Sequence, residues 1–184
     1  MKRDNLTLIE ILGVVALIVI LLTIGIGTYS YASDSAKEKA TKATVLRIDN
    51  AMQQLQDKGL LKKTTKDTDS TNGFVTITFD QDNSKIRFGS VEADSKVFKI
   101  FAKAVDADSI DSIMDDDKNI TDGWGQKILV RFPGKFNRGG FDIISAGSDG
   151  VFGDSTSGTV PPKDIGNYKD SDGELTCDDI SNFF

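Results

Sequence analysis

The sequence predicts an α+β protein in which one long N-terminal helix packs against a small antiparallel β-sheet head. Three observations support this fold class. Residues 6–31 form an apolar stretch, and no charged residue occurs from Ile11 to Ser33, whereas a helical membrane span needs ~20 residues. Apolar residues then recur at helical spacing as far as Leu55. Short alternating segments separated by turn residues follow this helix.

Residues 6–58 are predicted to form one continuous helix, transmembrane over 6–33 and amphipathic beyond. Four apolar residues of the amphipathic part share one face: Val45, Ile48, Met52 and Leu55. Gly59 is suited to end the helix. Gly25 and Gly27 each cost ~1 kcal/mol relative to Ala, so we expect a bend or local unwinding there.

Residues 34–184 are expected to form a globular head that includes the C-terminal half of the helix. Alternation predicts a hairpin from the strands 73–79 and 85–91, followed by a helix over 94–105. Two further strands are expected at 127–132 and 140–145. The acid-rich segment 107–117 is expected to be a solvated helix or loop.

Composition narrows the function. The net charge of −6 argues against nucleic acid as the main partner. The chain has no His and a single cysteine, Cys177, so it lacks the commonest general base and any partner for a Cys nucleophile. We therefore expect a protein that is not an enzyme.

Motifs at both ends resemble those of type IV pilins and of the major (G-type) pseudopilins of type II secretion systems. Residues 1–5 form a short basic leader-like segment, and Leu6-Thr7-Leu8-Ile9-Glu10 opens the apolar helix. Asn5 stands where that family has Gly, and Leu6 where it has Phe. Further on, three segments occur in the same order as the pseudopilin motifs: DGWGQKILVRFPG, GGFDIISAGSDGVFG and CDDISNFF.

This resemblance implies the pilin fold and a structural subunit that polymerises through its N-terminal helix into a pilus or pseudopilus filament. It implies leader cleavage between Asn5 and Leu6, N-terminal methylation, and assembly through Glu10 and the amine of Leu6. The implied location is the bacterial inner membrane before assembly, and a periplasmic pseudopilus or an extracellular pilus afterwards. The implied partners are further copies of the chain, the inner membrane, a prepilin peptidase, an assembly ATPase and a platform protein.

Two other functions remain open at this point. One is a surface type IV pilin used for adhesion, motility or DNA uptake. The other is a single-pass calcium-binding domain that never polymerises.

The C-terminal segment 145–184 is rich in oxygen donors, which are the ligands that Ca²⁺ prefers. The resemblance implies that Ca²⁺ is held there by Asp149, Asp178 and Asp179 and by the backbone carbonyls of Ala146 and Val151. Ser145 is a further candidate ligand. The alternative for the whole segment is an acidic tail without a metal site.

The spacing leaves two further possibilities open. Asp164 lies in a second Asp-Ile motif and is an alternative closing ligand. Asp170, Asp172, Gly173 and Asp179 match positions 3, 5, 6 and 12 of an EF-hand-like loop, so a second calcium site is conceivable from the sequence. Position 1 of that loop would be Tyr168.

Overall fold

The computed structural model describes residues 8–61, 72–153, 158, 160–162, 168, 172–173, 175 and 177–183, apart from the side chains of 24–28. The chain divides into two compact units, Met1–Ala36 and Lys37–Phe184. The predicted leader residues Asn5 and Leu6 lie outside the described residues.

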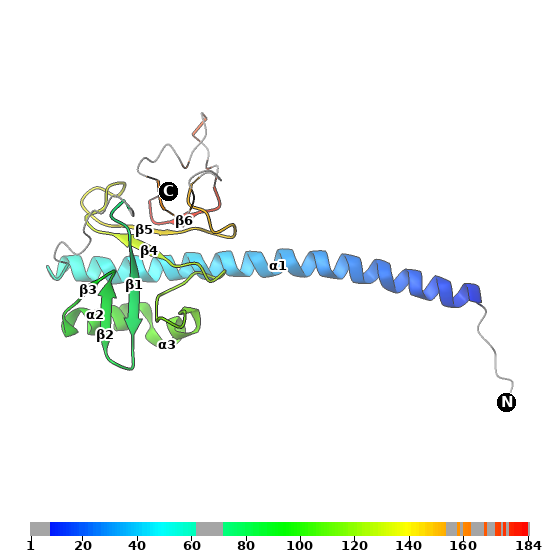
Figure 1. Cartoon of the computed structure of the whole chain (residues 1–184), viewed down its shortest axis with the longest axis horizontal. Helices are drawn as coiled ribbons and strands as arrows, with labels where there is room; N and C mark the ends of the chain where they lie inside the picture. Colours follow the sequence, from blue (N-terminus) through cyan, green and yellow to red (C-terminus); the bar gives the residue numbers. More distant parts are fainter. Residues whose placement is uncertain are drawn as a thin grey trace. The chain divides into compact units, whose positions relative to one another are not determined.

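The helix α1 runs over 50 residues, Leu8–Asp57 (Figure 1). It continues as helix through Gly25 and Gly27, so the local unwinding expected there is not observed. It ends as predicted at Gly59, whose φ of 64° is left-handed. The amides of Gly59 and Leu60 donate to the carbonyls of Gln56 and Leu55, both at 2.9 Å, which satisfies the last turn.

The prediction of a transmembrane segment over 6–33 is wrong for the described part of α1. None of the described helices has the length and apolar character needed to cross a bilayer. The predicted inner-membrane location, which depended on this span, is withdrawn with it.

The second unit contains a six-stranded sheet in the order β3-β2-β1-β4-β5-β6, with every neighbouring pair antiparallel. Its strands are β1 (Val75–Asp80), β2 (Lys85–Phe88), β3 (Val91–Glu92), β4 (Leu129–Arg131), β5 (Asp142–Ser145) and β6 (Ile180–Ser181). The predicted hairpin is confirmed, because β1 pairs with β2 across a turn that Asp80 closes by accepting from the Asn83 amide at 3.1 Å. The strands expected at 127–132 and 140–145 are also confirmed, in shorter form.

Three short helical segments join the strands: α2 (Ser95–Val105), α3 (Ala107–Ile110) and the 3₁₀ turn η1 (Asp111–Ile113). The helix expected over 94–105 is thereby confirmed, and Asp94 caps it by accepting from the Lys96 amide at 2.8 Å. The fold class is corrected accordingly. The described chain is an α+β fold with a six-stranded antiparallel sheet and four helices, and the membrane span of the predicted pilin fold is not part of it.

The main core lies between the second half of α1, α2 and the sheet. The predicted apolar face of α1 is confirmed, since Val45, Ile48, Met52 and Leu55 are at most 4 % exposed. These side chains share one hydrophobic cluster with β1, β2, β4 and α2. A smaller cluster, formed by Phe74, Ile144, Ala146, Phe152 and Tyr168, lies under the C-terminal segment.

Candidate assembly helix and C-terminal acidic loop

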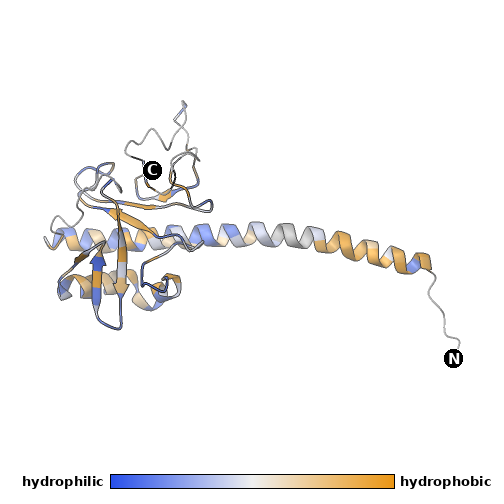
Figure 2. Ribbon diagram, in the orientation of Figure 1, coloured by the Kyte–Doolittle hydropathy of each residue, from blue (hydrophilic) through white to orange (hydrophobic). Residues whose placement is uncertain are grey.

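From Leu8 to Leu22, α1 exposes its apolar side chains on every face (Figure 2). Ten of them are between 49 % and 60 % exposed: Ile11, Leu12, Val14, Val15, Leu17, Ile18, Val19, Ile20, Leu21 and Leu22. A surface helix of a globular protein is apolar along one stripe only, whereas a helix that is apolar all round is normally buried. This part of α1 is therefore a surface that needs covering from several sides.

Glu10 lies in the first turn of α1 and is exposed. A carboxylate there interacts favourably with the positive end of the helix dipole, typically by ~0.3–1 kcal/mol. The other two predicted assembly and cleavage residues, Asn5 and Leu6, lie outside the described residues. An amine contact between Leu6 and Glu10 therefore stays a prediction.

Gly123, in the loop before β4, contacts the second half of α1 directly. Its amide donates to Thr41 Oγ1 at 2.9 Å. A Cβ at this position would lie 2.8 Å from both Cβ and the carbonyl oxygen of Lys37, so only glycine allows this approach. Proline at this position could not donate this hydrogen bond.

Asp122 is a buried organising residue that the sequence did not single out. Its Oδ1 accepts from the amides of Trp124 and Gln126, both at 2.9 Å, and its Oδ2 accepts from Ser145 Oγ at 2.6 Å. The Asp-Gly pair was the available signal, because Asp side chains in turns bond to amides two residues on. Ser145, a predicted metal ligand, is thus engaged by a carboxylate of the protein.

The predicted ligand Asp178 accepts hydrogen bonds from the loop that follows β5. Its Oδ2 accepts from the Ser148 amide, from Ser148 Oγ at 2.6 Å, and from the Asp149 amide at 3.2 Å. Burial would raise the pKa of Asp178, but the hydrogen bonds from Ser148 and Asp149 outweigh it, so the pKa lies below its ordinary value. Asp149 is exposed, and its own Oδ1 accepts from the Val151 amide at 2.8 Å.

Asp179 is buried beside this loop. Its Oδ2 accepts from the Gly153 amide at 2.6 Å, while its buried Oδ1 has no hydrogen-bond partner in the described part of the chain. The pKa of this carboxyl is raised to about 7, chiefly by burial and also by the neighbouring Asp178 and Asp149, against the lowering effect of the Gly153 amide. The two adjacent acids therefore have opposite environments.

The remaining predicted ligands differ in exposure where the structure describes them. Ala146 is buried, Val151 is half-buried and Asp172 is exposed, while Asp164 and Asp170 lie outside the described residues. Tyr168, which would open the EF-hand-like loop, is fully buried and packs edge-on against Phe136 with ring centroids 5.9 Å apart.

The description of this chain as a metal-binding protein is therefore corrected. Over the described residues, no group of three or more His, Cys, Asp or Glu could hold a metal ion. The physical reason is that the backbone amides of separate loop positions already bind Asp149, Asp178 and Asp179. Calcium as a cofactor of the whole chain stays a prediction, because Asp164 and Asp170 are among its proposed ligands.

A third buried acid, Asp142, pairs with Arg131 across β4 and β5. Arg131 Nε donates to Asp142 Oδ2 at 2.9 Å, and the two side chains are 7 % and 0 % exposed. Three amides of the β4–β5 loop also donate to Asp142, and the guanidinium lies 4.3 Å from the Phe74 ring centroid. Sequence analysis missed this pair, since neither residue stands out from the strand pattern.

No protein-family model, curated protein or solved structure matches this chain. The resemblance to pilins and pseudopilins therefore depends on the sequence motifs alone.

Proposed function

We propose that this protein is a structural subunit that assembles with further copies of itself into a filament, through the N-terminal half of α1. The filament subunits that the sequence resembles assemble in the same way. The observation that carries the proposal is the exposure of apolar side chains on every face of α1 from Ile11 to Leu22.

One neighbouring helix would cover only one stripe of α1, about 100° wide. Consecutive apolar residues such as Leu17, Ile18 and Val19 point in different directions, and each is about half exposed. Covering all of them needs several helices around each copy, which is the arrangement in the centre of a helical bundle. Gly13 has no atom within 4 Å of an added Cβ, so it leaves room for a close neighbour.

Burial of these side chains supplies enough free energy for association. Full burial of a Leu, Ile or Val side chain contributes ~1.5–3 kcal/mol. Ten side chains that are half exposed therefore contribute on the order of 10 kcal/mol, which is comparable to the estimated cost of association. Assembly should accordingly be concentration-dependent.

Glu10 is proposed to act in assembly by pairing with a cation of a neighbouring copy. A carboxylate among apolar helices is costly to bury alone, and an opposite charge offsets that cost. In the resemblance the partner is the free amine at Leu6. The same resemblance implies a peptidase, an assembly ATPase and a platform protein as helpers.

The critical concentration for assembly of the full-length protein, measured by sedimentation and negative-stain electron microscopy, tests the proposal. The variant Leu17→Gln/Ile18→Gln should raise it by at least about tenfold, since each substitution removes roughly 1 kcal/mol of apolar burial and introduces a buried amide. The matched control, Lys39→Gln/Asn50→Gln, changes two exposed residues in the second half of α1 and should leave it unchanged. Wild-type protein that stays monomeric at every concentration would overturn the proposal.

A second pair of variants tests Glu10. Glu10→Ala should reduce assembly strongly. Glu38→Ala removes an exposed acid of the same helix, paired with Lys42 at 2.6 Å, and should have little effect on assembly. If Glu10→Ala and Glu38→Ala assemble equally well, Glu10 has no role in the proposed interface. The role of the apolar surface would still be tested by the Leu17→Gln/Ile18→Gln variant and its control.

A further inference from the structure

The helix α2 carries three lysines along its outer face. Lys96, Lys99 and Lys103 follow an i, i+3, i+7 spacing and are exposed, while the opposite face of α2 is buried through Val97 and Phe101. The ion pairs found within the described residues include none of these lysines. Like charges at this spacing repel one another by a few tenths of a kcal/mol per pair. A negatively charged surface placed against these lysines would therefore be stabilising.

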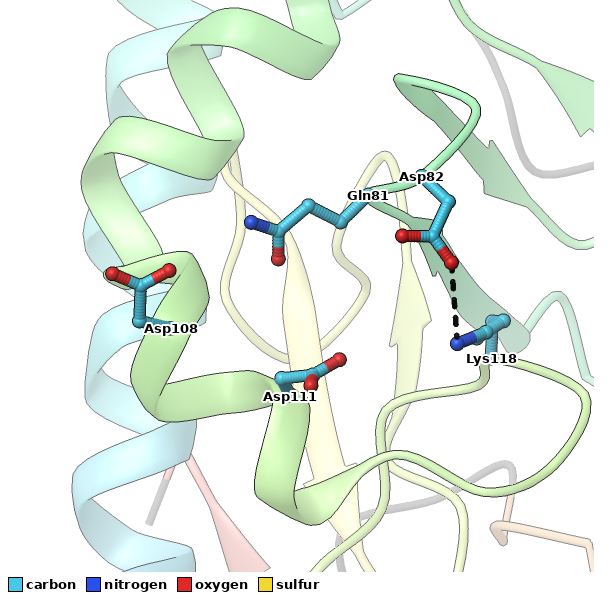
Figure 3. A pocket seen from close by; sticks show the side chains of 5 residues that line it. All are labelled: Gln81, Asp82, Asp108, Asp111 and Lys118. Carbon is cyan, nitrogen blue, oxygen red and sulfur yellow. Dashed lines mark ion pairs between the residues drawn. The ribbon is translucent and has the colours of Figure 1, made fainter.

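An acidic depression of about 290 Å³ lies just beyond the C-terminal end of α2. Asp108 and Asp111 line it from the helical side, and Gln81, Asp82 and Lys118 line it from the other side (Figure 3). Lys118 Nζ lies 3.9 Å from Asp82 Oδ2 and offsets one of the three carboxylates. The described ion pairs include neither Asp108 nor Asp111, so the depression keeps a net negative charge.

The lysine face begins at the end of α2 that is farther from the acidic depression, although Lys103 lies in the last turn, next to the depression. Lys96 is in the first turn of α2, whereas Asp108 and Asp111 come after its last turn, which is about 16 Å further along the helix. Figure 1 shows α2 alongside the head half of α1, with α3 at one end of it. Copies displaced along α2 would therefore bring the Lys96 end of this helix in one head toward the acidic depression of the next.

We propose that the lysine face of α2 docks onto the acidic depression of a second copy of this chain. This interface rests on the proposed filament function and names a contact between heads, separate from the apolar contact between helices. The argument for the occupant is charge complementarity. Among the described residues, one chain carries a cationic face outside any ion pair and a depression with net negative charge, in which Asp108 and Asp111 also take part in no ion pair. The contact is heterologous, since a different surface of each copy takes part, and such contacts generate open helical arrays when they do not close into a ring.

Charge reversal of the full-length protein tests this contact. Lys96→Glu/Lys99→Glu and, separately, Asp108→Lys/Asp111→Lys should each raise the critical concentration for assembly about tenfold at 0.1 M salt, because exposed pairs contribute up to ~1 kcal/mol each. The quadruple variant carrying both sets inverts both surfaces and should recover assembly close to that of wild type. At 1 M salt, where the Debye length falls to about 3 Å, the double variants and wild type should converge.

The control Lys58→Glu/Arg138→Glu makes the same change of net charge as the lysine variant, at exposed residues outside α2, and should leave assembly unchanged. Thermal unfolding of each variant verifies that the head is folded. If the aspartate variant does not fold, the lysine variant alone tests the contact, because both of its substitutions lie on the exposed face of α2. Double variants that shift assembly no more than the control, or a quadruple variant that fails to recover, would overturn the contact between heads. Absence of assembly by wild type would instead overturn the proposed function.

Discussion

Arg131 and Asp142 form the most completely buried ion pair of the described head, and replacing Arg131 by methionine should destabilise the protein severely. Methionine is similar in length and keeps part of the packing. It removes the charge that faces Asp142, whose carboxylate is 0 % exposed. The change also removes the donor to the Asn72 carbonyl at 3.1 Å.

The expected loss of stability depends on the Asp142 carboxylate, which stays buried after Arg131 is replaced. Removing one partner of a buried pair typically costs 3–5 kcal/mol, because the other charge stays buried. Amides of Lys135, Phe136 and Asn137 still donate to Asp142, which moves the expected cost toward about 3 kcal/mol. Loss of the guanidinium over the rings of Phe74 and Phe136, at 4.3 and 4.7 Å, adds ~0.5–2 kcal/mol.

The assay is thermal and urea unfolding of the full-length protein followed by circular dichroism. For a chain of this size, 1 kcal/mol shifts the melting temperature by about 2–4 °C, so Arg131→Met should lower it by roughly 10 °C. As a control, Arg138→Met changes an exposed position of the β4–β5 loop and should change the free energy of unfolding by no more than about 0.5 kcal/mol. A loss below about 1 kcal/mol for Arg131→Met would refute the claim that this pair holds β4 and β5 together.

Three further predictions concern the loops around the sheet. Gly123→Ala should lower the free energy of unfolding, measured in urea, by ~1–3 kcal/mol, because the new Cβ would lie 2.8 Å from Lys37. Gly140→Ala should be tolerated, because the nearest atom to its Cβ would be 3.5 Å away. Ser145→Ala should cost ~1–3 kcal/mol by removing a buried donor to Asp122, and an unchanged urea midpoint would contradict that bond. Burial raises the pKa of Asp179 from 3.8 to about 7, so the folded state keeps a proton that the unfolded state releases. The free energy of unfolding should therefore fall, by on the order of 3 kcal/mol, as the pH rises from about 4 through 7, and Asp179→Asn should flatten this dependence.

Local patterns in the sequence determined much of the secondary structure. The helical spacing of Val45, Ile48, Met52 and Leu55 predicted the buried face of α1, and the alternation on either side of residues 81–84 predicted the β1–β2 hairpin. Such patterns are reliable because the repeat of the backbone sets which side chains share a face. The same hydrophobicity also predicted a membrane span, which was wrong for the described helix. An apolar face shows that a surface needs covering but does not identify what covers it.

The partners of the polar side chains were decided by the tertiary structure alone. Arg131 and Asp142 meet across two strands, and Asp122 meets Ser145 across 23 positions of the chain. In the C-terminal segment, an abundance of oxygen donors predicted calcium ligands. The folded chain places Asp178 against the amides of the loop after β5 and buries Asp179 beside Gly153, and neither partner could be read from the sequence. A carboxylate can be satisfied by a cation or by backbone amides, and the choice depends on which distant segment the folded chain brings within about 3 Å of it.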